Sequence, residues 1–197
     1  MHMNITDRQM EIIEASGRIL ASRGISALTI KNLASEIGFV ESALYRHFKS
    51  KEDIIVLLIK YLHNNIESRF EPILHQQGTN QDKLQQLFNS QFTFLSENPH
   101  FVVVALSDGL IDETDSIKNE VMKIFLYKMS VISHLFDDGL KQREWQTLLP
   151  PADLIHFLMG GFRLLMFKWK FSHFSFDLVK EGNHMIQQFF TMIQVKN

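Results

Sequence analysis

The residues whose types and spacing could do chemistry lie in one stretch, residues 29–51, where short polar side chains, a phenol and several cations follow one another. Apolar residues at i, i+4 and i+8 set the inward edge of a short helix there, and polar residues point away from it. The inward residues are Val40, Leu44 and Phe48, and the outward ones are Glu41, Ser42 and Tyr45. Packing does not need such an outward face, but the face can read base edges and grip phosphates. The stretch therefore indicates nucleic-acid binding.

Other chemistries find little support. His134 and Asp138 have the i, i+4 spacing of half a metal site, but two ligands on one helix do not complete a coordination shell. The chain has no cysteine, which excludes a disulfide framework and a thiolate metal site. It also lacks a glycine-rich phosphate loop, a nucleophile elbow and a metalloprotease motif. We expect no enzymatic activity, no cofactor and no metal.

Helix caps position the polar residues. The first helix of the stretch has one apolar stripe, formed by Ile30, Leu33, Ala34 and Ile37. The Thr29 hydroxyl can cap its start, and Gly38 can end it, because a tight turn commonly needs a positive φ. Ser50 and Asp53 have the spacing of a capping box at the start of a longer helix. Lys51 then sits at a positive helix end with free N–H groups, which is a ready phosphate site.

This stretch resembles the helix-turn-helix of the TetR family of bacterial transcriptional regulators. Residue types and spacing agree across more than twenty positions, which include Thr29, Ile30, Leu33-Ala34, Ile37-Gly38, Leu44-Tyr45, His47-Phe48 and Ser50-Lys51-Glu52. Family members often carry Val-Ser after the glycine and a small pair such as Gly-Thr before Leu-Tyr. This chain instead has Phe39-Val40 and Ser42-Ala43. Because those positions include base readers, the operator sequence does not carry over.

The resemblance implies a role for each matched residue and an all-α architecture of about nine helices. Phosphate contacts fall to Thr29, Tyr45 and Lys51, base-edge contacts to Lys31, Glu41, Ser42 and Ala43, and a phosphate or groove-edge contact to His47. Residues 1–49 would form the DNA-binding domain. Residues 50–197 would form a larger helical domain for effector binding and dimerisation.

Charge alone does not reveal a DNA-binding protein. Lys and Arg number 20 against 22 Asp and Glu, so the formal net charge is −2 and any binding must rest on a local patch. An apolar content of 45% in 197 residues supplies a real core. The N-terminus has no apolar segment typical of a signal peptide, and the longest aliphatic run, residues 54–59, is too short to span a bilayer. We expect a cytoplasmic protein without a membrane partner.

The sequence predicts helices throughout and no sheet. Outside the motif they cover approximately residues 7–23, 50–70, 81–97, 101–106, 115–143 and 151–171, with a last helix capped by Ser175. Pro72 should end or kink the second of these. The FVVVAL run at 101–106 has strand propensity, but no partner strand is visible, so helix is favoured.

The last two helices are apolar on too much of their surface for the outside of a monomer, which favours a homodimer face over ordinary core packing around a tolerated diglycine. The interface candidates are Leu154, Leu158, Gly161, Leu165, Met185, Phe189 and Met192. The chain is also rich in Phe and Met, with 17 and 9 residues. Such side chains line adaptable cavities, although each is compatible with simple core packing. The family resemblance implies an effector pocket, for which the candidates are Phe88, Phe92, Met122, Phe125, Met159, Phe162, Arg163 and Trp169.

The prediction for the whole chain is a ligand-responsive, DNA-binding transcriptional regulator. A homodimeric repressor that a small apolar or amphipathic effector releases from a palindromic operator fits the resemblance best. Two alternatives remain open at this point. One is a helical lipid or acyl-ligand binding protein whose DNA-binding head is non-functional, and the other is a TetR-like activator.

Overall fold

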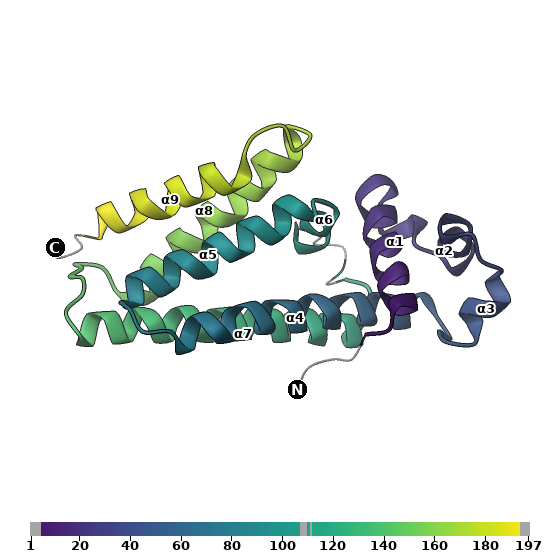
Figure 1. The fold of residues 1–197 in the computed structure, drawn as a ribbon, viewed down its shortest axis with the longest axis horizontal. Coiled ribbons are helices and arrows are strands. Elements are labelled where there is room, and N and C mark those ends of the chain that lie inside the picture. The colour runs from purple at the N-terminus through teal and green to yellow at the C-terminus, as the bar shows by residue number, and fades with distance from the viewer. Residues whose placement is uncertain (1–4, 107–109, 111, 194–197) are drawn as a thin grey trace. The chain divides into compact units, whose positions relative to one another are not determined.

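The computed structural model describes residues 5–106, 110 and 112–193, and within these ranges the chain is helical with no strand (Figure 1). This confirms the predicted all-α class with a helix-turn-helix head. The α-helices are α1 (Asp7–Arg23), α2 (Ile30–Ile37), α3 (Glu41–Tyr45), α4 (Lys51–His75), α5 (Asn80–Glu97), α6 (His100–Leu106), α7 (Asp115–Lys141), α8 (Pro151–Phe171) and α9 (Leu178–Met192). A short 3-10 helix, η1 (Ile25–Ala27), joins α1 to α2.

Two compact units divide the chain. The first comprises residues 1–66 and 100–124, and the second comprises residues 67–99 and 125–197. Helices α4 and α7 therefore each contribute residues to both units. The predicted domain boundary at residue 49 stays a prediction.

The first unit is built on α1, which packs against α2 and α6. Its core contains fully buried aliphatic side chains from four helices, among them Ile12, Ile19, Leu33, Leu44 and Ile55. Gly17 on α1 allows α6 to come close, because a Cβ at this position would overlap the His100 ring and lie 3.0 Å from Phe101 Cε1. The α1–α6 contact therefore holds the helix-turn-helix to the segment that precedes α7.

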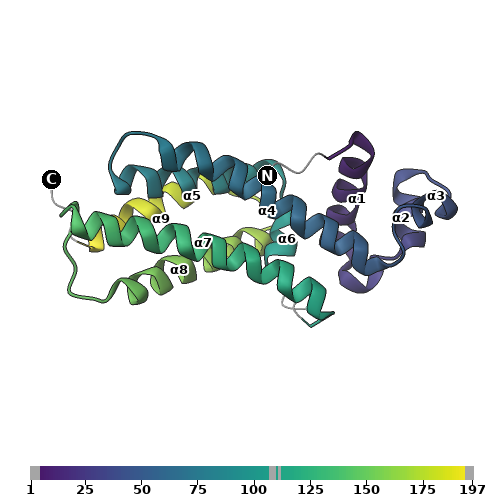
Figure 2. The ribbon, with the colours of Figure 1, turned by 90° about the horizontal axis from the view of Figure 1, so that it is seen from below.

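In the second unit, α9 packs against α5 and α8; Figure 2 shows these helices from below. The core is aromatic, with Phe92, Phe136 and Trp145 fully buried. Glu144 caps α5 from a distant loop, since its carboxylate accepts hydrogen bonds from the Asn80 N–H at 2.7 Å and the Asn80 side-chain amide at 2.8 Å. No described helix is both long enough and apolar enough to cross a membrane.

Most of the predicted helix ends are confirmed, and three details are wrong. Pro72 lies inside α4, which continues to His75, because a proline in the last turn removes only one hydrogen bond. The cap of α9 is Asp177 instead of Ser175, since the Asp177 carboxylate accepts from the Lys180 N–H at 2.9 Å. Val40 is 68% exposed because it precedes α3 as its N-cap instead of lying on its inward edge. The FVVVAL run is helical, as predicted.

Candidate nucleic-acid interface and ligand cavity

Helix α2, which leads into the turn before α3, is capped at both of its ends. The Asn32 N–H donates to the Thr29 hydroxyl at 3.1 Å, which satisfies a free amide at the start of α2. Gly38 ends α2 in the left-handed region, with φ 71° and ψ 32°. The predicted cap and stop of this helix are therefore confirmed.

The outward face of α3 carries the predicted readers. Glu41 and Ser42 are exposed, Ala43 is half-buried and Tyr45 is 56% exposed, whereas Leu44 lies in the core. His47 follows in a turn and is also exposed. Because α3 is five residues long, this face is small.

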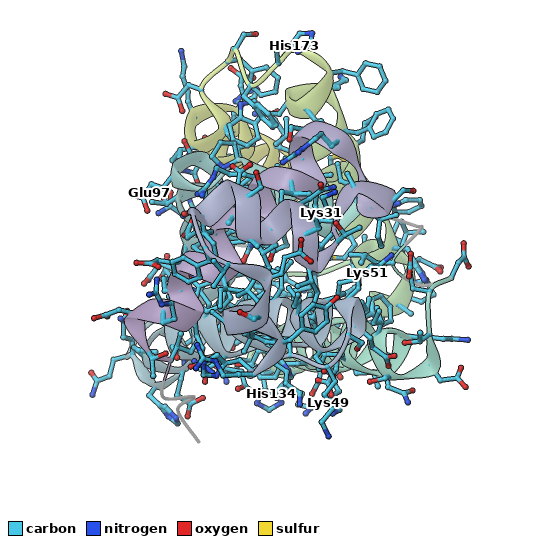
Figure 3. The ribbon with its side chains drawn as sticks, turned by 90° about the vertical axis from the view of Figure 1, so that its right-hand side faces the viewer. Lys31, Lys49, Lys51, Glu97, His134 and His173 are labelled. Atoms are coloured by element: carbon cyan, nitrogen blue, oxygen red, sulfur yellow. The ribbon has the colours of Figure 1, made fainter. Side chains whose placement is uncertain are left out.

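Three lysines lie on the elements next to α3. Figure 3 labels the side chains of Lys31, Lys49 and Lys51. Lys31 is exposed on α2, and Lys49 is exposed just before α4. Glu36, an acidic residue of α2, is ion-paired with Arg18 at 3.5 Å and Arg23 at 3.0 Å. The charge of Glu36 is thus offset by two arginines of α1.

The start of α4 has reciprocal caps and two links to the segment before α7. The Asp53 N–H donates to the Ser50 hydroxyl at 3.3 Å, and the Ser50 N–H donates to the Asp53 carboxylate at 3.2 Å, as predicted. The Lys51 ammonium donates to Glu113 at 2.9 Å. The Thr114 hydroxyl donates to the neighbouring Glu52 at 3.0 Å. The two links tie a proposed phosphate contact to a part of the chain far away in sequence.

The contact between Arg8 and Phe39 is one that the helix-turn-helix motif does not predict. The Arg8 guanidinium of α1 lies 3.7 Å from the centre of the Phe39 ring, a cation–π distance. Phe39 is one of the residues that depart from the family pattern, and Arg8 lies outside the matched stretch. Spacing along the sequence therefore could not have paired them.

A small cavity of about 20 Å³ lies in the second unit. It is lined by Phe70, Leu87, Phe88, Gln91, Lys128, Ile132, Met159 and Phe162. Phe88, Met159 and Phe162 are among the predicted pocket residues. The structure brings them together from α5 and α8, and helices α4 and α7 supply Phe70, Lys128 and Ile132.

The other predicted pocket residues lie elsewhere. Phe92 is fully buried and does not line the cavity. Its ring stacks on that of Phe162, a lining residue, with the ring centres 5.6 Å apart. Trp169 is buried and donates its indole N–H to the Phe176 carbonyl at 2.9 Å. Met122, Phe125 and Arg163 are exposed. Among the described residues these five do not line this cavity, and their role in an effector site stays a prediction.

Two of the residues around this cavity, Gln91 and Lys128, have polar side chains, although the surface of the cavity is almost wholly apolar. The Arg69 guanidinium donates to the Gln91 amide oxygen at 2.8 Å and to the Ser90 hydroxyl at 2.9 Å. Burial lowers the pKa of Lys128, and the nearby charge of Arg69 lowers that pKa further. The sequence reading named neither Lys128 nor Gln91, because each looks like an ordinary polar residue on an amphipathic helix.

The predicted dimer residues divide by burial. Leu154, Leu158 and Phe189 are buried within their own chain. Gly161, Leu165 and Met185 are half-buried, and Met192 is 72% exposed. A different set on α8 is exposed, namely Phe157, Leu164, Phe167 and Phe171. Positions 157, 164 and 171 repeat every seven residues and so share one face of the helix.

Comparisons with known proteins agree with this architecture. A family model described as bacterial regulatory proteins of the tetR family matches residues 12–58. The nucleoid occlusion factor SlmA of Marinobacter nauticus is 32% identical over 157 residues, which cover 78% of this chain and 80% of that protein. The fatty acid metabolism regulator protein of Bacillus subtilis is 22% identical over 183 residues, which cover 91% of this chain and 92% of that protein.

Two solved structures share the fold. The fatty acid degradation regulator FadR from Bacillus halodurans has a TM-score of 0.85 at 15% identity, with 98% of this chain and 100% of that chain covered. FadR from Bacillus subtilis, solved in complex with stearoyl-CoA, has a TM-score of 0.79 at 20% identity, with 91% and 96% covered.

The cap of α2 makes a testable contribution to the head. We expect Thr29→Ala to lower the free energy of unfolding by about 1 kcal/mol, because the Asn32 N–H loses its acceptor. Thr29→Ser keeps the hydroxyl and should stay close to wild type. Urea denaturation followed by circular dichroism measures both, and equal stability of Thr29→Ala and wild type would contradict the role of the cap.

Proposed function

Because the chain belongs to the TetR family of bacterial regulatory proteins, we propose that it is a homodimeric transcriptional repressor which a small apolar or amphipathic effector releases from a palindromic operator. One observation carries this proposal. The same chain pairs an exposed polar face on α3 with an aromatic-walled cavity in its second unit. The first feature supports DNA recognition, and the second supports effector binding. Such a regulator works in the cytoplasm, where bacterial DNA lies.

DNA contacts follow from exposure and from helix ends. Thr29 at the start of α2, Tyr45 on α3 and Lys51 at the start of α4 contact phosphates in this proposal, and His47 lies at the phosphate or groove edge. The base-edge contacts come from Lys31, Glu41, Ser42 and Ala43. Free N–H groups at the two helix starts add positive potential beside the same phosphates.

Lys51 has to exchange partners to act on DNA. Its ammonium pairs with Glu113 at 2.9 Å, and both side chains keep about a third of their surface in solvent, at 31% and 27%. Exposed pairs of this kind contribute little to stability. A phosphate can therefore replace Glu113 at small cost, after which Lys51 makes a charge-assisted contact with the backbone of the operator.

The exposed face of α8 supports the homodimer. Phe157, Leu164 and Phe171 are 59%, 55% and 70% exposed, and together they form an apolar stripe that spans two heptad repeats. A second copy of the chain would bury this stripe in a symmetric interface. Two heads about one DNA turn apart then match the half-sites of a palindromic operator.

Effector release depends on coupling between cavity and head. Helices α4 and α7 both supply cavity residues, and the starts of the same helices belong to the first unit. An effector shifts the equilibrium only by as much as its affinities for the two states differ. The relatives carry different named roles, one in nucleoid occlusion and another in fatty acid metabolism. The specific role of this chain therefore has to be determined from its own DNA sites and its own ligand.

The phosphate contact of Lys51 can be tested with DNA fragments, including the one upstream of the chain's own gene. We expect Lys51→Ala to weaken binding about equally on all sequences and to reduce the slope of log affinity against log salt by about one. Fluorescence anisotropy at several salt concentrations measures the slope. Lys141→Ala is the matched control, because Lys141 also pairs with a surface carboxylate, Asp138 at 3.1 Å. A slope unchanged by Lys51→Ala would remove Lys51 from the interface.

A charged substitution in the apolar stripe of α8 should weaken dimerisation. Leu164→Glu places a charge in the proposed interface and should raise the dimer dissociation constant at least tenfold, or roughly 1.4 kcal/mol. Leu148→Glu is the control, because Leu148 is 98% exposed on the loop before α8 and off the stripe. Sedimentation equilibrium gives both constants. A Leu164→Glu protein that dimerises as tightly as the control would place the interface elsewhere.

A further inference from the structure

We propose that Arg8 is a positioning residue for DNA reading, because its guanidinium holds the Phe39 ring and thereby fixes the start of α3, the helix that carries proposed base readers. The inference rests on the proposed function, since it takes α3 as the element that enters the DNA groove. It adds a side chain of α1 that determines sequence preference through Phe39, without a base contact of its own.

Helix α3 has weak local support. It is five residues long, and a helix of this length makes too few backbone hydrogen bonds to be stable by itself. Its N-cap, Val40, makes no side-chain cap hydrogen bond, and a valine side chain has no oxygen that could accept one. Leu44 is the residue of α3 that lies in the core. Packing therefore anchors the end of α3, whereas its start depends on the turn that precedes it.

The turn before α3 contains one aromatic side chain. Gly38 has a φ of 71°, and the Phe39 N–H donates to the Ala34 carbonyl at 2.8 Å, so the backbone of the turn is bonded back to α2. Val40, the next residue, is 68% exposed, whereas Phe39 is half-buried. Of the two residues between Gly38 and α3, Phe39 is therefore the one whose side chain can fix the turn.

Arg8 provides the contact for the Phe39 ring. Its guanidinium carbon lies 3.7 Å from the ring centre, well within the roughly 6 Å limit of cation–π contacts. The Glu11 carboxylate, one turn further along α1, accepts a hydrogen bond from the same guanidinium at 2.7 Å. Helix α1 is itself fixed in the core of the first unit by Ile12 and Ile19. The Arg8–Phe39 pair thus ties the turn to a helix that is already held in place.

A displaced start of α3 would affect the proposed readers directly. Glu41 and Ser42 are the first two residues of α3, and both are exposed. Hydrogen bonds to base edges carry the sequence information and depend on direction as well as distance, whereas phosphate contacts carry no sequence information. Loss of the Arg8–Phe39 pair should therefore reduce the preference for one DNA sequence over another and leave the number of phosphate contacts unchanged.

Fluorescence anisotropy with the full-length protein tests this separation. The preferred duplex is the one that wild type selects from a pool of random sequences, and a scrambled duplex of the same composition is the reference. Arg8→Gln and Phe39→Leu should each lower the ratio of the two affinities by about threefold, the size of an exposed cation–π contact. The slope of log affinity against log salt should stay at its wild-type value in both variants.

Two further variants serve as rescue and control. Phe39→Tyr keeps the ring face and should retain the wild-type ratio. Glu11→Gln removes the negative charge beside Arg8 but keeps the cation over the ring, so it should also stay close to wild type. A Phe39→Tyr protein that loses as much of the ratio as Phe39→Leu would count against the cation–π contact.

The double variant Arg8→Gln/Phe39→Leu shows whether the two side chains act together. It should lose no more of the ratio than either single variant, since all three remove the same contact. Additive losses would overturn the inference. An unchanged ratio in Arg8→Gln with a salt slope lower by about one would make Arg8 a phosphate contact instead, which also overturns it. If Phe39→Leu does not fold, Arg8→Gln decides, because the Arg8 side chain is 54% exposed.

A new N-cap tests whether the pair acts through the start of α3. Val40→Ser supplies the missing cap oxygen, so Arg8→Gln/Val40→Ser should regain most of the ratio that Arg8→Gln loses. No recovery would contradict the proposed route. If wild type selects no duplex from the pool, the proposed function fails and this inference fails with it. If wild type selects a duplex and all variants keep the full ratio, this inference alone fails.

Discussion

A single close contact between α5 and α9 determines the wall of the cavity. The Phe92 ring lies where the Cβ of any other residue at position 182 would be, so glycine is required there. Phe92 in turn stacks on Phe162 and lies 6.2 Å from Phe88, and both of these rings face the cavity. Close packing of this kind transmits changes in side-chain volume to neighbouring groups. The contact therefore sets the shape of the cavity from a position that no ligand touches.

The two units differ in how far the sequence predicts them. The helix-turn-helix depends on local rules, and the Thr29 cap, the Gly38 stop and the Ser50–Asp53 box follow from residue types at fixed spacing. Local rules fail where an end is ambiguous, as with Val40, which precedes its helix instead of packing on it. The residue after a tight turn can belong to either side of a helix boundary.

The cavity depends on tertiary contacts, which periodicity does not contain. Three of its residues follow from the abundance of Phe and Met, but Lys128 and Gln91 have no motif, and Arg69 gives Gln91 its orientation from another helix. The dimer face shows the same limit. An apolar stripe on α8 is visible in the sequence, but only packing decides that Leu158 faces the chain's own core and Leu164 faces outward. In physical terms, the sequence shows which apolar side chains should be buried, but it does not show which residues they pack against.

Regulation requires that effector binding in one unit changes the contacts of Lys51 in the other. The most direct test is the DNA affinity of wild-type protein, measured by fluorescence anisotropy on the fragment upstream of its own gene, with and without saturating decanoate as a small amphipathic probe. We predict tight, salt-sensitive binding that prefers this fragment over unrelated DNA and weakens at least fivefold with decanoate, the lower end of typical allosteric coupling. Weak and equal binding to every fragment, or tight binding that decanoate leaves unchanged, would contradict a ligand-released repressor.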